Sequence, residues 1–327
     1  MIFAKFVHAF RNGAIALATA CLIAPSSFAQ TEDYGLPPLG TLDASVTRDK
    51  ATDLPHFNIY RPVNLSQQHK PMPVIVWANG GCMPWDGLWI RLFNRWAGAG
   101  YVVISYTNMD ELKDYASQMR PGPAAGAKPA APAAAPASMG SLIAATEDRQ
   151  EQAIDWAIRA NSAKDSPFYG KLDTKRIVAA GNSCGGITSL GIATHDKRIK
   201  SIFVLSGGSL PPGAPLEMRE AIMSKITAPT IILVGGKDDL AHIPAGVDFS
   251  ILPATTPGVM VYRSSGTHDL MSSDPGVEQV AGEIGLEWFR ATLYHDKSAA
   301  KELTTKICPD CDAATWSVDS RHFFGSH

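Results

Sequence analysis

A short segment near the middle of the chain carries residues suited to nucleophilic catalysis. It reads Gly-Asn-Ser-Cys-Gly, with Ser183 at its centre and Gly181 and Gly185 two residues to either side. A serine hydroxyl at the tip of a sharp strand-to-helix turn can attack a carbonyl carbon, and such a turn needs small residues at these two positions. The backbone N–H of Cys184 would then point toward the oxygen that becomes negative during acyl transfer. The segment therefore predicts a serine nucleophile at position 183.

The sequence around this segment predicts the strand and the helix that the turn requires. From residue 55 onward, short apolar runs alternate with helical patterns, which is typical of a mostly parallel sheet with helices on both faces. The expected strands are residues 56–63, 74–77, 101–106, 176–180, 201–205, 230–234 and 259–263. Helical spacing is found at residues 88–97, 141–161, 186–194 and 277–294. Ser183 falls between the fourth of these strands and the third of these helices.

Four motifs together resemble the secreted α/β-hydrolases of the dienelactone-hydrolase and cutinase-like group. They are Asn79-Gly80-Gly81-Cys82, the turn around Ser183, Gly235-Gly236-Lys237-Asp238-Asp239, and Gly266-Thr267-His268. The resemblance extends over about residues 45 to 327, and it implies the α/β-hydrolase fold with catalytic Ser, Asp and His in that order along the chain. We therefore expect residues 30–327 to form a single domain of this fold.

The resemblance also implies a general base and an acid that orients it. His268 lies just after the last expected strand, where this group of enzymes has its catalytic loop. Asp238 and Asp239 both follow the strand at 230–234, and similar sequences favour Asp239 as the acid, with Asp238 as the alternative. His242 is close by, but two candidate ligands do not make a metal site. We expect neither a metal ion nor a cofactor.

The second oxyanion donor is expected in the loop after the strand at 74–77, because that strand ends beside the nucleophile in this fold. Either Gly81 or Cys82 would supply the N–H. The bulky residues that follow, Met83, Trp85 and Trp89, could line an acyl pocket, and ordinary core packing is the alternative for them.

The cysteines predict two disulfides if the chain is exported. Cys308 and Cys311 are close enough in sequence for a local bridge in the C-terminal tail. Cys82 and Cys184 are then left for each other, and both lie at or beside an expected oxyanion donor, so their Cα atoms should be within disulfide range. The alternative is a pair of buried free thiols at 82 and 184.

The N-terminus reads as a signal peptide over residues 1–29. Lys5 and Arg11 precede an apolar run, and Ser27-Phe28-Ala29, with small residues at its first and third positions, forms a cleavage pattern. We expect a periplasmic or extracellular protein, with lipidation at Cys21 as the alternative. After cleavage, the chain would have 31 acidic residues and 27 basic ones (29 less Lys5 and Arg11), which gives a formal charge of about −4. The basic residues are scattered, so no nucleic-acid partner is expected, and no segment has the ~20 apolar residues of a membrane span.

Two segments show neither the spacing of a strand nor that of a helix. Residues 121–137 are dominated by Ala and Pro, which predicts a flexible surface insertion, either a solvated loop or a lid over the site. Residues 298–327 are expected to form an irregular tail.

The expected activity is that of a carboxylic-ester hydrolase acting through an acyl-enzyme on a small-molecule or polymeric ester. The alternatives are a serine peptidase of the same fold, which uses the same three side chains, and a binding protein that has lost catalysis.

Overall fold

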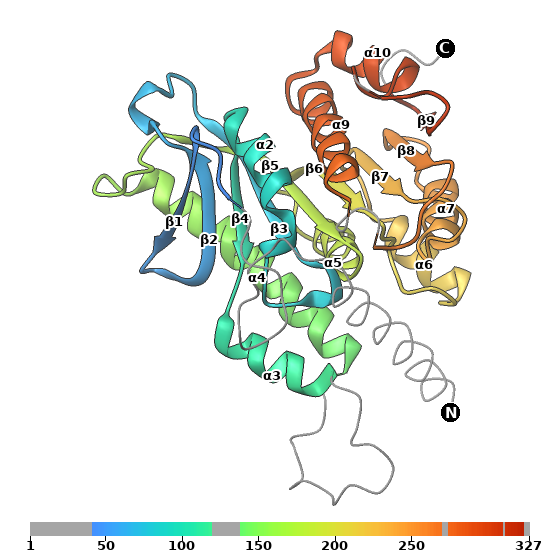
Figure 1. Ribbon diagram of the computed structural model, residues 1–327, viewed down its shortest axis with the longest axis horizontal. Coiled ribbons are helices and arrows are strands. Elements are labelled where there is room, and N and C mark those ends of the chain that lie inside the picture. The colour runs from blue at the N-terminus through green and yellow to red at the C-terminus, as the bar shows by residue number, and fades with distance from the viewer. Residues whose placement is uncertain (1–40, 120–137, 270–273, 310, 324–327) are drawn as a thin grey trace, which may run out of the picture.

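The computed structural model describes residues 41–119, 138–269, 274–309 and 311–323. Within these residues, nine strands form one sheet in the order β1-β2-β4-β3-β5-β6-β7-β8-β9 (Figure 1). The strands are β1 (Val46–Ala51), β2 (Leu54–Pro62), β3 (Met72–Ala78), β4 (Val102–Tyr106), β5 (Leu172–Asn182), β6 (Ile199–Leu205), β7 (Thr230–Val234), β8 (Gly258–Arg263) and β9 (Trp316–Arg321). In sheet order, the strands β4-β3-β5-β6-β7-β8 are parallel to one another. At the two edges, β1, β2 and β9 pair antiparallel with their neighbours.

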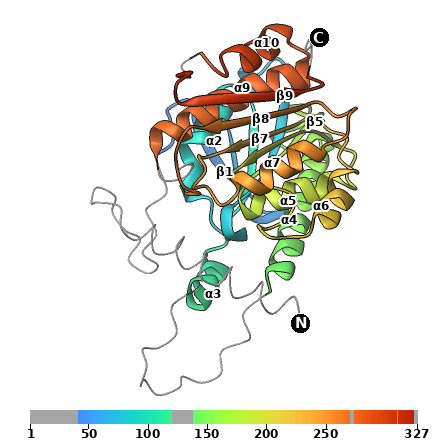
Figure 2. The same ribbon diagram turned by 90° about the vertical axis from the view of Figure 1, so that its right-hand side faces the viewer.

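Helices cover both faces of the sheet (Figure 2). The α-helices are α2 (Ile90–Gly98), α3 (Met109–Met119), α4 (Met139–Ser162), α5 (Cys184–Ala193), α6 (Leu216–Met223), α7 (His242–Ile251), α9 (Pro275–Tyr294) and α10 (Lys297–Thr305). Short 3-10 turns are η1 (Leu65–Gln67), η2 (Gly80–Cys82) and η3 (Gly87–Trp89). Side chains of α2, α9 and α10 pack on one face, and those of α4 to α7 pack on the other.

The alternation of side chains along the strands creates these two cores. In β3, Ile75 and Trp77 point toward α2 and α9, while Val74 and Val76 point toward α4 and α5. All four side chains are buried, which explains why the strand reads as a continuous apolar run. Because the strands from β4 to β8 run in the same direction, their carboxyl ends lie at one edge of the sheet, and the loops that carry the motifs follow these ends.

The fold class expected from the sequence is confirmed. All seven expected strands and all four expected helices form, with ends that differ by a few residues. The structure adds β1, β9, α3, α6, α7 and α10.

The expectation of an irregular tail over residues 298–327 was wrong. Most of α10 lies in it, and β9 pairs with β8 and completes the sheet. The buried side chains Leu303 and Trp316 hold both elements to the core, so the tail is part of the domain. The expected signal peptide at 1–29, Cys21 and the insertion at 121–137 lie outside the described residues.

Over the ranges that the structure describes, no helix combines the length and the apolar character needed to cross a bilayer.

Candidate active site

Ser183 is the single residue between β5 and α5, and its backbone is strained. Its φ of 51° and ψ of −113° lie outside the regions that a side chain normally allows. The turn is tight because the backbones of Gly181, Gly185 and Ala78 meet there. A Cβ atom at Gly181 would overlap the Gly185 carbonyl group, and one at Gly185 would overlap the carbonyl oxygen of Ala78. The two glycines are therefore required for this turn.

His268 and Asp239 complete a hydrogen-bonded chain with Ser183. His268 Nε2 lies 2.8 Å from Ser183 Oγ, and His268 Nδ1 lies 2.8 Å from Asp239 Oδ1. His268 is in the loop after β8, and Asp239 is in the loop after β7. The structure thus brings together the three residues expected from the sequence, although they are up to 85 positions apart in it.

The surroundings of Asp239 hold it as a carboxylate. Burial raises its pKa, but the hydrogen bond and the charge of His268 and the amides of Ala241 and Gly235 outweigh burial, so the pKa lies below its ordinary value. Oδ2 accepts from Gly235 N–H and Oδ1 from Ala241 N–H, both at 2.8 Å. Asp238 is exposed instead. Of the two candidate acids, only Asp239 contacts His268.

Two backbone amides beside the Ser183 turn are candidate donors to an oxyanion. Cys184 is the first residue of α5, and the first N–H groups of a helix have no partner within it. Gly81 lies in η2 with a left-handed backbone, at a φ of 64°. The Cys82 N–H already donates to the Asn79 carbonyl oxygen at 3.2 Å, which favours Gly81 over Cys82 as the second donor.

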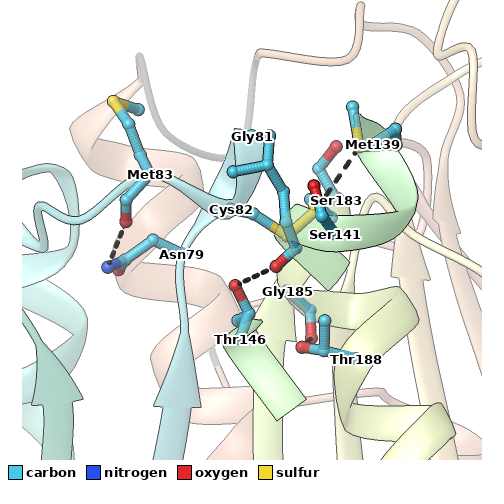
Figure 3. Close-up of a disulfide and its surroundings, with 12 residues drawn as sticks. Asn79, Gly81, Cys82, Met83, Met139, Ser141, Thr146, Ser183, Gly185 and Thr188 are labelled. Carbon is cyan, nitrogen blue, oxygen red and sulfur yellow. Dashed lines mark hydrogen bonds between the residues drawn. A yellow bond between two sulfur atoms is a disulfide. The ribbon is translucent and has the colours of Figure 1, made fainter. Parts of the chain in front are cut away.

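The side chain of Asn79 fixes the shape of the η2 turn (Figure 3). Its Oδ1 accepts from the Trp77 indole at 2.9 Å, and its Nδ2 donates to the carbonyl oxygens of Met83 and Tyr106, both at 3.1 Å. The turn is therefore tied to the ends of β3 and β4, which explains why asparagine opens the Asn-Gly-Gly-Cys motif.

Both disulfides expected from the sequence are present. Cys82 of η2 is joined to Cys184 of α5 with a Cα–Cα distance of 5.3 Å (Figure 3), and Cys308 is joined to Cys311. The first bridge links the two turns that carry the candidate oxyanion donors. The second closes a local loop after α10.

The three residues expected to line a pocket differ in their surroundings. Trp89 is only 1% exposed and packs against Trp77 in the core between the sheet and α2, so the sequence expectation was wrong for Trp89. Trp85 is also buried. Met83 is half-buried, and its side chain points away from the core (Figure 3).

Sequence reasoning missed two residues near Ser183. Met139, in the first turn of α4, places its sulfur 4.0 Å from Cys184 Sγ. Tyr115, in α3, donates a hydrogen bond from its hydroxyl to the Gly81 carbonyl oxygen at 3.0 Å. The helix-start signal of Asn108 followed by Asp110 and Glu111 was present in the sequence and would have indicated α3.

A mostly parallel sheet with a nucleophile turn after β5 defines an α/β-hydrolase. Residues 141–273 match a family model, PETase, described as PET hydrolase-like, and the match includes Ser183, Asp239 and His268. The chain thus has the α/β-hydrolase fold, and its residues 141–273 are similar to a cutinase and dienelactone-hydrolase-like family, which indicates a hydrolase acting on esters. No curated protein matches the chain.

Proposed function

We propose that this protein is an exported serine hydrolase that cleaves carboxylic esters through an acyl-enzyme, with Ser183 as nucleophile, His268 as base and Asp239 as the orienting acid. The observation that carries the proposal is the chain of two 2.8 Å contacts from Ser183 through His268 to Asp239, centred on a strained strand-to-helix turn. Backbone strain of this kind costs about 1–3 kcal/mol and persists mainly at functional sites.

In the proposed mechanism, His268 Nε2 accepts the Ser183 proton as Oγ attacks the ester carbonyl carbon. The carbonyl oxygen becomes an anion and accepts hydrogen bonds from the N–H groups of Cys184 and Gly81. The protonated imidazole then donates its proton to the leaving alcohol, and a water activated by His268 releases the acid. Asp239 fixes the His268 ring with Nδ1 protonated and stabilises the charged imidazole.

Two features support export. Both cysteine pairs within the described residues are disulfides, and stable disulfides are typical of proteins outside the reducing cytoplasm. The charged, apolar and small-residue regions of residues 1–29 have the order of a cleaved signal. N-terminal sequencing of the protein recovered outside the cytoplasm tests this part, and a chain that still begins at Met1 would contradict it.

The esterase assignment is tested with p-nitrophenyl esters of increasing acyl length and with a fluorophosphonate probe. We expect hydrolysis by the wild type, labelling at Ser183, and loss of both in Ser183→Ala with the fold retained. Because the matched family is PET hydrolase-like, PET film is the polymer to test first. Absence of labelling in the folded wild type would favour a non-catalytic protein, and cleavage of amides with no ester activity would favour a peptidase.

A further inference from the structure

The contact between Tyr115 and Gly81 joins α3 to the turn that carries a candidate oxyanion donor. The Tyr115 hydroxyl donates to the Gly81 carbonyl oxygen at 3.0 Å. It also fills the space beside this glycine, because a Cβ atom at Gly81 would lie 2.6 Å from the hydroxyl oxygen. Gly81 has a φ of 64°, and its backbone is free to move in a way that other residues are not. The Tyr115 hydroxyl thus restrains a glycine of the turn at a backbone conformation that other residues rarely adopt.

Three neighbouring residues of α3 and its cap hold Tyr115 in place. Asn108 Oδ1 accepts from the N–H groups of Asp110 and Glu111 and begins the helix. Glu111 accepts two hydrogen bonds from Arg149 of α4, at 2.7 and 2.9 Å. Leu112 is buried. Because residues three and four apart share a helix face, Glu111 and Leu112 fix the face that presents Tyr115 to Gly81.

The chemistry of the contact requires a neutral phenol. Burial raises the pKa of Tyr115 to about 12, so its hydroxyl keeps its proton over the whole range in which an esterase is assayed. The Gly81 carbonyl oxygen can only accept. The direction of this hydrogen bond is therefore fixed.

We propose that Tyr115 is a positioning residue of the oxyanion hole, which holds the Gly81 backbone so that its N–H faces the oxygen formed when Ser183 attacks. The proposal rests on the proposed esterase function. Loss of the Tyr115 hydroxyl should lower kcat and change KM little. The reason is that the Gly81 N–H forms its strongest hydrogen bond with the substrate oxygen once that oxygen becomes an anion in the transition state. Tyr115 lies on α3, so under this proposal α3 supports catalysis from outside the triad.

The test compares Tyr115→Phe with Tyr169→Phe, a control that removes the hydroxyl of a tyrosine 50% exposed on a distant loop. Removal of an oxyanion donor lowers kcat by about 10²- to 10³-fold, and loss of its positioning should cost less, so we expect a decrease of about 10- to 100-fold in Tyr115→Phe. KM for p-nitrophenyl butyrate should stay within about twofold. Phenylboronic acid, whose oxygen occupies the oxyanion hole when it binds a serine, should inhibit more weakly by a similar factor. Tyr169→Phe should match the wild type.

A second variant covers the case in which Tyr115→Phe folds poorly. Glu111→Gln keeps the Tyr115 hydroxyl but weakens the contact with Arg149 that holds this face of α3, so we expect a smaller decrease in kcat, again with little change in KM. Unchanged kcat in both folded variants would overturn the proposal, as would a lower melting temperature without any loss of kcat or of boronate affinity. If the wild type hydrolyses no ester and Ser183 is not labelled, the proposed esterase function is wrong. If the wild type is active and Tyr115→Phe is equally active, the esterase function stands and only the role of Tyr115 is wrong.

Discussion

Cys82 and Cys184 lie 5.3 Å apart between their Cα atoms and are covalently joined, although 102 positions separate them in the sequence. Cys184 directly follows the nucleophile candidate, and Cys82 directly follows Gly81. The bridge therefore joins the two backbone segments that carry the proposed oxyanion donors, Gly81 and Cys184. Its position indicates a role in the geometry of the site in addition to stability.

Replacement of both Cys82 and Cys184 by alanine should lower kcat and stability together. A bridge that closes a loop of about 100 residues contributes on the order of 4 kcal/mol, if it acts by restricting the unfolded chain. We expect about a tenfold decrease in kcat at a temperature where the variant is folded, because the two donors are then aligned only by non-covalent contacts. The measurements are urea unfolding and p-nitrophenyl ester kinetics.

The matched control is the double replacement of Cys308 and Cys311, whose bridge spans a sequence separation of only 3 and lies away from Ser183. This control should keep the wild-type kcat. Equal losses of kcat in the two double variants would show that the effect is not specific to the oxyanion turns. Peptide mapping without reductant should recover Cys82 linked to Cys184 in the wild type.

Asp239→Asn should be far more damaging than Asp238→Asn. The asparagine cannot stabilise the charged imidazole and favours the wrong ring tautomer of His268, so we expect kcat to fall by about 10³- to 10⁴-fold. Asp238 is exposed, and Asp238→Asn should stay near wild type. Steady-state kinetics of the two variants decide the assignment, and near-normal activity in Asp239→Asn would refute it.

The sequence was sufficient for the nucleophile turn because the local rules agree there. An apolar run over residues 176–180 predicted the central part of β5, helical spacing from residue 186 predicted α5, and the glycines at 181 and 185 marked the turn between them. The resemblance implied His268, and the structure places it near Ser183 because both residues follow the carboxyl ends of parallel strands.

The sequence was insufficient where long-range packing decides the conformation. β9 contains the charged residues Asp319 and Arg321 and has no apolar run, and it forms because it adds to the edge of β8 and buries Trp316. Trp89 and Met83 are close in sequence, yet only Trp89 enters the aromatic cluster around Trp77. Pattern alone does not distinguish these two outcomes, because both residues are large and apolar.

Arg219→Ala should destabilise the domain strongly. Arg219 and Asp248 form an ion pair at 3.0 Å in which the side chains are only 4% and 0% exposed. Arg219 also donates to the carbonyl oxygens of Leu210 and Pro211, in the loop that follows β6 and contacts the Ser183 turn through Gly207. Removal of one partner leaves a buried, unpaired carboxylate, which costs about 3–5 kcal/mol.

Urea unfolding of Arg219→Ala measures this cost, with Arg290→Ala as the control. Arg290 is 47% exposed and pairs with Glu287 and Asp296 at the surface, where such contacts contribute less than about 1 kcal/mol. A similar loss of stability in the two variants would contradict a special role for the buried pair.

Glu278 should make the stability of the protein decrease as the pH rises toward neutrality. Its carboxyl group is 1% exposed, accepts from the Leu92 N–H at 2.9 Å, and lies 3.4 Å from Arg91 Nη1. Burial outweighs these two contacts and raises the pKa of Glu278 from 4.5 to about 7.

Between pH 4.5 and 7 the folded state therefore holds a proton that the unfolded state has lost, and the free energy of unfolding falls with rising pH. Stability from this group is complete below pH 4.5 and is lost as the pH rises through 7, by a total on the order of 3 kcal/mol. Glu278→Gln keeps an oxygen that can accept from Leu92 N–H but has no proton to lose. We expect the stability of Glu278→Gln relative to wild type to increase by about 3 kcal/mol between pH 4.5 and pH 8, as measured by urea unfolding at each pH. A difference that stays constant over this range would show that folding does not raise the pKa of Glu278, because the Leu92 amide and Arg91 offset its burial.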